Sequence, residues 1–592
     1  MGEQSVSLMQ ELQSYVDAAS GFVWGPYLLI PLLVGTGAFL MLRLGFMPFR
    51  RLGMAFSLMW KGRRHDAAHE GELSPFNALM TSMAATVGTG NIVGVASAIM
   101  IGGPGAVFWM WVTALVGMAT KYCEAVLAVK YREVTPDGSY VGGPMYYIRK
   151  GLGENWAWMA VLFALFGAVA SFGIGNMTQA NSITASVADL INKFTEGSVQ
   201  AAAQAPTGLM ASLASLTQDM GGIENLAAAG TGASALLLVI AMMTRNEALV
   251  RNTARLLIVV MTVYYVLLGF IAEAMNIPGG LATYCTAAGL LLIIGLVLLG
   301  GVKRIGSVAG TLVPFMALFY IIIGIVAIIW NIDKVPGAFK MIFTEAFSLG
   351  SVAGGAFGVA IIVTIQNGVA RGLFSNEAGL GSAPIAHATA ITDSPVRQGF
   401  LGMLDPFLDT IVICSITALV VLVTNHWYYV DPATGEMLMD GAHGILSSVK
   451  LADLPPDVVQ KLGAEGMQAL AAKGELNKAL LTQRAFSQAI PGELGAYVVA
   501  VAQALFAFST ILGWCVYGER CCIYLFGHKS AFFFRSIFTL IVPLGAVVVV
   551  DLVWGLADVF NGLMALPNLV ALLLLSPVVI KLTREYFKEQ GK

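Results

Sequence analysis

The chain carries little charge for its length. Only 11% of its 592 residues are Asp, Glu, Lys or Arg, whereas soluble domains carry about 25%. The formal net charge is −2, so no basic surface for nucleic acid is indicated. The first 20 residues are polar and lack the basic start and apolar core of a cleaved signal peptide. These shortages argue against a soluble globular protein, against nucleic-acid binding and against removal of a signal peptide.

Residues that hold metals or act as nucleophiles are also scarce. His387 is the only histidine near the expected membrane depth, and nothing resembles a metal cluster or a Ser-His dyad. The six cysteines lie in or beside apolar segments without metal-ligand spacing, which predicts packing rather than disulfides or ligation. They are Cys123, Cys285, Cys414, Cys515, Cys521 and Cys522. The sequence therefore predicts neither an enzyme nor a cofactor.

Long apolar runs, by contrast, are abundant. The chain is 57% hydrophobic with a mean hydropathy of +0.77. About 20 apolar residues are needed to cross the hydrocarbon core as a helix. Thirteen such helices are predicted, near residues 23–43, 76–101, 105–130, 156–180, 225–243, 256–275, 282–300, 308–330, 352–373, 399–424, 495–514, 532–550 and 563–582. We therefore expect an all-α polytopic membrane protein.

Lys and Arg gather in alternate loops between these helices. Such residues are retained on the cytoplasmic side, which places the loop with Arg43, Arg50 and Arg51 inside. Alternation puts six further basic segments on the same side, with Lys130, Arg132, Arg149, Lys150, Arg245, Arg251, Arg255, Lys303, Arg304, Arg371, Arg397, Arg520, Lys529, Arg584 and Lys588. The pattern predicts a plasma-membrane protein (the inner membrane in bacteria) with its N-terminus outside and its C-terminus in the cytoplasm.

Two of the predicted helices are interrupted. The run Ala84–Asn91 (AATVGTGN) holds two glycines within three positions, and each glycine costs a helix about 1 kcal/mol. A second interruption is predicted in 352–373, from Gly354, Gly355, Gly358 and Gly368. Broken helices of opposite direction are typical of inverted-repeat transporters, whose freed backbone groups line a binding site. Five successive helices can be counted from each interrupted helix, which gives a 5+5 repeat. This count leaves out the helices at 23–43, 225–243 and 256–275.

Four runs carry a family resemblance. They are Thr86–Ala96 (TVGTGNIVGVA), Gly142–Ile148 (GGPMYYI), Gly368–Ala388 (GVARGLFSNEAGLGSAPIAHA), and Phe508–Trp514 (FSTILGW) with Tyr517–Arg520 (YGER). They resemble the alanine or glycine:cation symporter family, from about residue 20 to 585. The resemblance implies the leucine-transporter fold of the APC superfamily and sodium-coupled import of small neutral amino acids such as alanine and glycine.

The chain departs from the family pattern at 195–281, which holds the surplus helix pair, and at 426–494, a polar stretch expected to form an external cap. The predicted divisions are 1–74 (N-terminus, first helix and cytoplasmic loop), 75–194 (start of the first repeat), 195–281 (insertion), 282–350 (rest of the first repeat), 351–425 (start of the second repeat), 426–494 (cap) and 495–592 (end of the second repeat and C-terminus).

Sodium needs about five or six hard oxygen ligands, which carbonyls and hydroxyls supply without a buried charge. The run from Ala84 also resembles the first broken helix of neurotransmitter:sodium symporters. That resemblance implies a sodium ion held by the carbonyls of Ala84 and Val87 and the hydroxyls of Ser509 and Thr510. These hydroxyls could instead bond back to their own helix. A second sodium ion is expected at the Thr86 carbonyl and the Asn91 side chain, although Asn91 could merely cap the outer half-helix.

An amino-acid substrate is a zwitterion. Its carboxylate is expected at the free N–H groups where the outer half-helix begins, and its ammonium at polar groups of the second interrupted helix. Glycines near the third core helix suggest a pocket wall there, although small residues between packed helices explain them equally well. The predicted substrate contacts are Thr86, Gly88, Thr89, Gly90, Phe172, Asn176, Thr364, Gln366 and Asn367.

Charged residues at membrane depth usually mark function. An inner gate is predicted from a pair between Glu377 and Arg371 or between Asp409 and Arg397, with interfacial solvation of these groups and of Asp405 as the alternative. Trp514 fits either an interface anchor or a gate. Lys121 and Glu124, three residues apart on one helix, are expected to pair with each other.

Other transport classes remain open. A proton-coupled symporter of serine or glutamine would need the same architecture. A channel also uses broken helices, but it usually assembles its filter by symmetry, whereas this chain has enough helices to work as a monomer. Membrane lipid and a small neutral amino acid are the expected partners.

Overall fold

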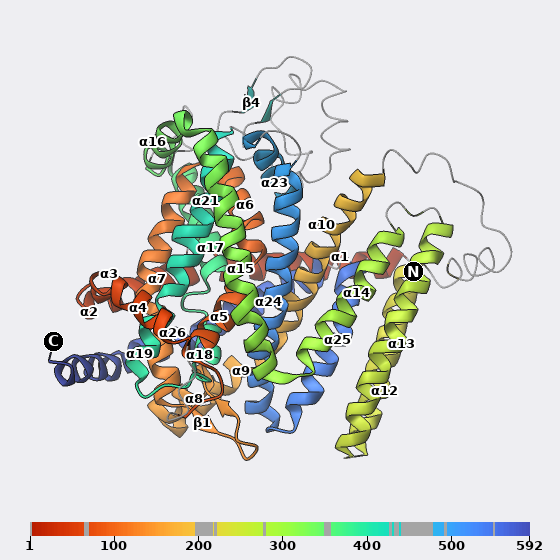
Figure 1. The fold of residues 1–592 in the computed structure, drawn as a ribbon, viewed down its shortest axis with the longest axis horizontal. Helices are drawn as coiled ribbons and strands as arrows, with labels where there is room; N and C mark the ends of the chain where they lie inside the picture. Colours follow the sequence, from red (N-terminus) through yellow and green to blue (C-terminus); the bar gives the residue numbers. More distant parts are fainter. Residues whose placement is uncertain are drawn as a thin grey trace.

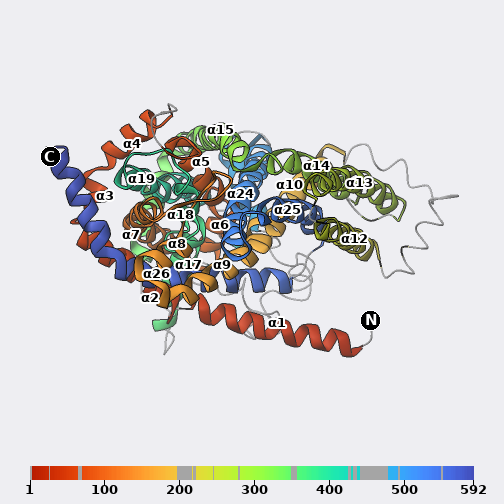
Figure 2. The same cartoon turned by 90° about the horizontal axis from the view of Figure 1, so that it is seen from below.

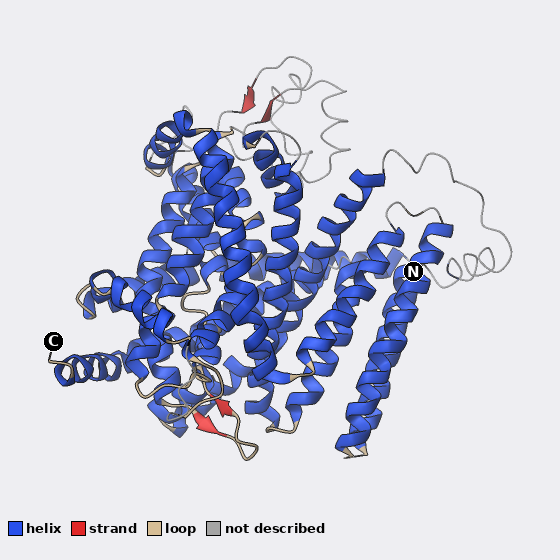
Figure 3. Ribbon diagram, viewed as in Figure 1, coloured by secondary structure: helices blue, strands red, loops and turns tan. Residues whose placement is uncertain are grey.

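The computed structural model is almost entirely helical (Figures 1 and 3). It describes residues 3–25, 27–63, 70–195, 217, 222–244, 246–275, 277, 280–347, 357–424, 429–430, 437–439, 478–490, 494–548 and 551–591. Most of the predicted cap and much of the predicted 195–281 insertion, including 196–216, lie outside these ranges. All six cysteines are free.

The helices of the first half are α1 (Glu3–Val23), α2 (Leu29–Arg43), α3 (Met47–Arg50), α4 (Leu52–Lys61), α5 (Pro75–Thr86), α6 (Val93–Gly102), α7 (Gly105–Lys130), α8 (Pro144–Tyr147), α9 (Ala157–Phe172), α10 (Thr178–Thr195), α12 (Ile223–Met243), α13 (Glu247–Ala274), α14 (Gly280–Leu298), α15 (Gly301–Trp330) and α16 (Val335–Glu345).

The second half holds α17 (Phe357–Asn376), α18 (Ala383–His387), α19 (Pro395–Gly402), α20 (Leu404–Pro406), α21 (Ser415–Val423), α23 (Lys478–Ala489), α24 (Leu494–Phe526), α25 (Ser530–Val547) and α26 (Asp551–Glu589). Wider π turns join some of these, at Ile148–Leu152, Gly173–Met177 and Phe407–Cys414. Short 3-10 turns occur at Thr89–Asn91, Glu154–Trp156 and Ile332–Lys334. Two small antiparallel pairs join β1 (Glu133–Val134) to β2 (Tyr140–Val141) and β3 (Tyr429–Val430) to β4 (Met437–Met439).

Within the described residues, ten helices are long and apolar enough to cross a membrane, or eleven if the bent pair α5–α6 counts as one. The prediction of thirteen is therefore too high by this measure. The first apolar helix, predicted at 23–43, covers only 15 residues, about 22 Å, against a hydrocarbon core of about 30 Å. The segment predicted at 352–373 is described from Phe357 and is not among these apolar spans. The predicted helix at 225–243 is confirmed as α12.

The first break lies where the glycines predict it. Helix α5 starts at Pro75, with the Ser74 hydroxyl accepting the Asn77 N–H, and ends at Thr86. Val87 and Gly88 then take non-helical conformations before the turn at Thr89–Asn91 leads into α6. The two halves meet at an angle of 60°.

The second break is not where it was predicted. Gly358 and Gly368 lie inside the continuous helix α17, while Gly354 and Gly355 lie outside the described residues. A Cβ on Gly368 would stand 2.3 Å from the Ala106 carbonyl oxygen, so this glycine permits close packing of α17 on α7.

The chain instead leaves the helix after Asn376. Glu377, Gly379 and Gly381 take positive φ values of 52°, 92° and 85° before α18 begins. Left-handed conformations are easy for glycine but strained for glutamate, so Glu377 must be held there by its surroundings.

The helices enclose both breaks. Helix α5 packs against α15 and α24, and α7 packs against α17 and α19. The pair α12–α13 stands at one edge of the bundle, where it packs on α14 and α25 (Figures 1 and 2). Its peripheral place agrees with the expectation of a surplus pair outside the core.

The order of helices makes a topology prediction. Three membrane-crossing helices, α13 to α15, separate Asn252 from Asp333, so the two residues should lie on opposite sides of the membrane. In a cysteine-free background, Asn252→Cys and Asp333→Cys should not both react with an impermeant maleimide added from one side. Labelling of both in intact cells would disprove this helix order. Labelling of both after permeabilisation is the control for reactivity.

Candidate functional site

The two breaks lie side by side in the centre of the bundle. A Cβ on Gly90 would stand 3.4 Å from atoms of Phe374 and Ser375 at the end of α17. The amide oxygen of Asn91 accepts the Gly88 N–H at 2.8 Å, which closes the turn between the two halves of the first broken helix. The Asn91 carbonyl accepts the Thr417 hydroxyl at 2.8 Å. Asn91 therefore caps the start of the outer half-helix in this structure.

Helix α24 presents two hydroxyls to the first break. The Ser509 hydroxyl is 3.4 Å from the Val87 carbonyl oxygen, and a Cβ on Gly88 would stand 2.5 Å from the Thr510 hydroxyl oxygen. Both hydroxyls also donate to the Phe506 carbonyl, at 2.8 Å and 2.9 Å. The structure thus brings Val87, Ser509 and Thr510 together, while the back-bonds weighed from the sequence form as well. Ala84, the other expected carbonyl ligand, is buried on the last turn of α5.

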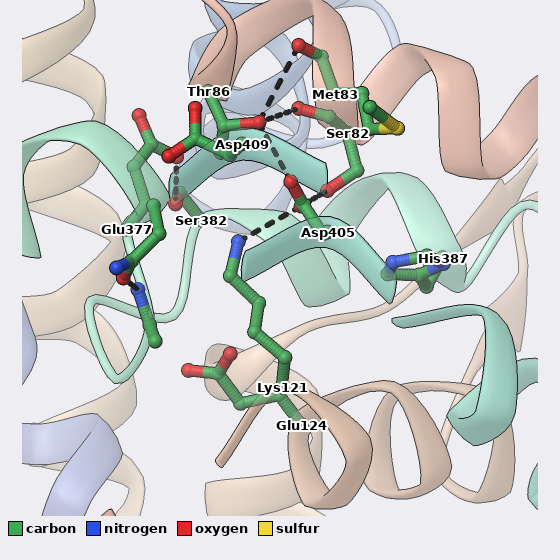
Figure 4. Close-up of polar contacts among 12 residues, drawn as sticks. Ser82, Met83, Thr86, Lys121, Glu124, Glu377, Ser382, His387, Asp405 and Asp409 are labelled. Atoms are coloured by element: carbon green, nitrogen blue, oxygen red, sulfur yellow. Dashed lines mark hydrogen bonds and ion pairs between the residues drawn. The ribbon is translucent and has the colours of Figure 1, made fainter. Parts of the chain in front are cut away.

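Asp405 organises the inner side of the break. It is fully buried and accepts the hydroxyls of Ser82 and Thr86, each at 2.7 Å (Figure 4). Its third neighbour is the ammonium of Lys121, whose nitrogen lies 3.1 Å from the carboxylate oxygen that also accepts the Ser82 hydroxyl. Lys121 therefore pairs with Asp405 rather than with Glu124, and the expectation of a Lys121–Glu124 pair is wrong. The alternative of interfacial solvation fails for Asp405.

Asp409 connects the two breaks. Its carboxylate accepts the Asn91 amide at 2.6 Å and the hydroxyls of Ser375 and Thr410 at 2.8 Å and 2.7 Å. The predicted pair with Arg397 does not form, because Arg397 lies at the surface and binds Asp393 at 2.9 Å. The position of Asp409 in the predicted helix 399–424 indicates a place near the membrane boundary, whereas the structure buries this residue beside the breaks.

Glu377 anchors the second break. It accepts the Trp514 indole N–H at 3.0 Å and the Ser382 hydroxyl at 2.5 Å. Its predicted partner Arg371 has Asp558 of α26 as electrostatic neighbour instead. Trp514 is 1% exposed, so the interface-anchor interpretation is wrong and the ring belongs to the interior of the bundle.

The same break is bound from α7 and α26. Glu124 accepts the Gly381 N–H at 3.2 Å and the Asn568 amide at 2.7 Å. The Asn568 amide also donates to the Gly379 carbonyl at 2.9 Å. These contacts satisfy backbone groups that the unwound segment would otherwise leave unpaired within the membrane.

Five predicted substrate contacts lie elsewhere. Thr364 and Asn367 flank Gly102 at the far end of α6, and Gln366 shares their helix. Phe172 packs against two rings of α25 in a tilted arrangement, and Asn176 donates to the Phe538 carbonyl at 2.7 Å, so both side chains contact α25. The remaining predicted contacts, Thr86, Gly88, Thr89 and Gly90, line the first break.

A second polar cluster fixes the start of α5. The Arg520 guanidinium donates to the Glu72 carboxylate at 3.1 Å and 3.4 Å and also lies 4.0 Å from Glu519. The Arg520 and Glu72 side chains are 2% and 7% exposed. The Tyr140 N–H of β2 also donates to Glu72. The adjoining backbone pairs with the loop after α18, where the Glu72 and Leu73 N–H groups donate to Thr389. The inner half-helix is thereby tied to α24 at its first residues.

Comparison with known proteins shows the family of the chain. The model of the Sodium:alanine symporter family matches residues 9–279, 230–449 and 463–592. The chain is 39% identical to the sodium/alanine symporter AgcS of Methanococcus maripaludis, over 97% of each chain. It is 39% identical to an uncharacterized transporter of Haemophilus influenzae, over 98% of this chain and 96% of that one. It is 31% identical to a probable sodium/glutamine symporter of Bacillus subtilis, over 98% and 92%.

The chain belongs to the sodium:alanine symporter family. It is therefore a multi-pass membrane transporter and not an enzyme, as the sequence predicted. Charged side chains buried in such a protein are costly in free energy, because a carboxylate or ammonium in a low-dielectric interior requires compensation. Four carboxyl side chains (Glu124, Glu377, Asp405 and Asp409) are buried around the breaks, where Lys121 pairs with Asp405 and hydrogen bonds compensate the others.

Loss of the carboxylate at Asp405 tests this compensation. Asp405→Asn leaves the Lys121 ammonium buried without its partner, so stability should fall by about 3–5 kcal/mol. Lys121→Met combined with Asp405→Asn removes the orphaned charge and should lose less. Thermal unfolding of the purified chain in detergent measures both. Asp393→Asn, which breaks the exposed pair with Arg397, is the control and should change stability by under about 1 kcal/mol. Equal losses in the single and double variants would contradict this account.

Proposed function

We propose that this chain is a secondary active symporter that imports small neutral amino acids, alanine and glycine among them, using the sodium gradient. The observation that carries the proposal is the Val87–Gly88 break faced by the hydroxyls of Ser509 and Thr510. The 5+5 leucine-transporter arrangement is part of the proposal and is supported by two discontinuous helices lying side by side. Two relatives, named as a sodium/alanine symporter and a probable sodium/glutamine symporter, agree with this class of substrate.

Sodium is expected between the inner half-helix and α24. The carbonyls of Ala84 and Val87 and the two hydroxyls are neutral oxygen ligands, which suit a hard monovalent cation. The ion would compete with the back-bonds to Phe506, and these hydroxyls can rotate away from that carbonyl. A second sodium at Thr86 and Asn91 is less well supported, because the Asn91 oxygen already accepts the Gly88 N–H.

The substrate is expected between the two breaks. The turn at Thr89–Asn91 and helix α6 offer the positive end of a helix dipole to a carboxylate. Helix α17 ends at Asn376, and its last carbonyls offer the negative end to an ammonium. This arrangement replaces Thr364, Gln366 and Asn367 with the C-terminal end of α17. Gly88 and Gly90 add no side chain between the backbone and the substrate, which favours a small amino acid closely bound.

The Glu72–Arg520 pair is proposed as the inner gate, in place of the two pairs predicted from the sequence. Release of substrate toward the cytoplasm requires the start of α5 to part from its neighbours, and this buried pair resists that step. The orientation predicted from basic loops puts the start of α5 in the cytoplasm, with the N-terminus of the chain outside.

Uptake into proteoliposomes tests the function and its sodium site together. Labelled alanine should accumulate and saturate only with an inward sodium gradient. Ser509→Ala with Thr510→Ala removes two ligands, so the half-saturating sodium concentration should rise at least tenfold, or about 1.4 kcal/mol. The affinity for alanine should recover at saturating sodium, because the binding of alanine and the binding of sodium are thermodynamically linked.

The matched control is Ser536→Ala with Thr539→Ala on α25, whose buried hydroxyls also bond back to their own helix. It should leave the sodium dependence unchanged. An unchanged dependence in the Ser509 and Thr510 variant would show that its hydroxyls serve only their helix. Non-saturating, gradient-independent flux would identify a channel, and uptake driven by a proton gradient alone would identify a proton symporter.

A double-mutant cycle tests the gate. Glu72→Gln keeps an acceptor for the Tyr140 N–H but removes the charge, so the closed inner side should lose stability. The half-saturating external alanine concentration should then rise several-fold, because fewer molecules face outward. Arg520→Gln and the double variant should have the same effect as Glu72→Gln, since each removes the same pair. The exposed pair Asp393–Arg397, neutralised as Asp393→Asn with Arg397→Gln, is the control. Additive effects at 72 and 520 would exclude a shared gate.

A further inference from the structure

A basic pocket lies outside the central site, between the end of α2 and the C-terminal part of α26. Its volume is about 370 Å³. The C-terminal part of α26 extends away from the bundle beside α2 and α3 (Figures 1 and 2), and Pro577 within this helix removes one backbone N–H. The residues that line the pocket are Arg43, Pro577, Ile580, Lys581, Arg584 and Glu585.

Positive charge dominates this pocket. Arg43 ends α2, while Lys581 and Arg584 are three residues apart and share a face of α26. The one carboxylate, Glu585, is half exposed and lies 3.9 Å from Lys581, at the limit of an ion pair. In the part of the chain that the structure describes, neither Arg43 nor Arg584 has a carboxylate within ion-pair distance. The pocket therefore offers two guanidinium groups suited to an anion with several oxygens.

The surroundings of the pocket are apolar. Pro577 and Ile580 form part of its wall, and Leu42 and Phe46, close to Arg43 in the sequence, are 65% and 49% exposed. Because α2 has only 15 residues, its terminal Arg43 stays close to the hydrocarbon region. A soluble anion would contact only the charges, whereas an amphipathic molecule would also cover this apolar surface.

We propose that this pocket binds the phosphate head group of an anionic phospholipid, with the acyl chains lying along the apolar residues of α2 and α26. Basic pockets between helices at a membrane boundary recognise such head groups by charge and by hydrogen bonds to phosphate oxygens. The lipid would hold the end of α2 against the C-terminal part of α26. The site is independent of substrate and sodium, which act at the breaks.

Native mass spectrometry of the purified full chain tests the proposal. Phosphatidylglycerol and phosphatidylcholine with identical acyl chains are added separately in detergent, and the chain should bind phosphatidylglycerol at least tenfold more tightly. The triple variant Arg43→Gln, Lys581→Gln and Arg584→Gln should lose this preference. The control Arg255→Gln, Lys303→Gln and Arg304→Gln removes the same types of charge elsewhere and should keep it.

Three results would overturn the proposal. One is equal binding of both lipids by the unaltered chain, and another is equal loss in the two triple variants, which would mean non-specific attraction. The third is displacement of phosphatidylglycerol by millimolar inorganic phosphate, which would identify a site for free anions. If the pocket triple variant unfolds at a lower temperature, Arg43→Gln and Arg584→Gln are measured singly, and each should lower the preference several-fold.

Discussion

Backbone groups freed inside a membrane must be paired within the protein, and this requirement governs the centre of the molecule. Side chains such as Asn91 and Glu124 pair these backbone groups, and two aspartates hold the polar side chains around the breaks in place. Asp405 binds the last turn of α5 through Ser82 and Thr86, while Asp409 binds Asn91 of one break and Ser375 of the other. The carboxylates are themselves buried, so each depends on the donors that it organises. The unwound segments, the buried acids and Lys121 therefore form one interdependent polar network, in which no member is stable alone.

The charges in this network bear on which ligand drives transport. Four carboxyl side chains and Lys121 are buried around the two breaks, whereas the oxygens facing the Val87–Gly88 break from α24 are neutral hydroxyls. A sodium ion bound there would add positive charge near these carboxyl groups. A zwitterionic substrate adds none. This difference favours the sodium ion, rather than the substrate, as the species that drives transport. Under the proposed function it also explains why neutral oxygen atoms are enough to bind the ion.

The sequence predicted the first break but misplaced the second, and the reason is physical. Gly88 interrupts a helix. Gly368 lies within a helix, and a side chain has no room there because Ala106 packs against it. Composition alone cannot separate these two uses of glycine. The prediction of Thr364 and Asn367 as substrate contacts depends on a break in their helix, which the structure shows as continuous from Phe357 to Asn376. The charge of Asp405 at membrane depth indicates a functional residue from the sequence alone. Its partners Ser82 and Lys121 come from distant parts of the chain, so their contact with Asp405 could not be derived from residue spacing.

Helix α24 connects the proposed sodium site to the proposed gate. It is continuous from Leu494 to Phe526 and contacts α5 at both ends, through Ser509 and Thr510 at the break and through Arg520 at Glu72. The two contact points are about 16 Å apart along a helix without an interruption. A sodium ion that joins α5 to α24 at the break therefore favours the same relative position of the two helices as the ion pair at the start of α5. Loss of the ion removes one attachment, which leaves the buried Glu72–Arg520 pair and the contact of the Tyr517 hydroxyl with the Ser82 carbonyl as barriers to inward opening. Coupling of ion and gate then requires no long pathway of side chains, because one rigid helix carries both contacts.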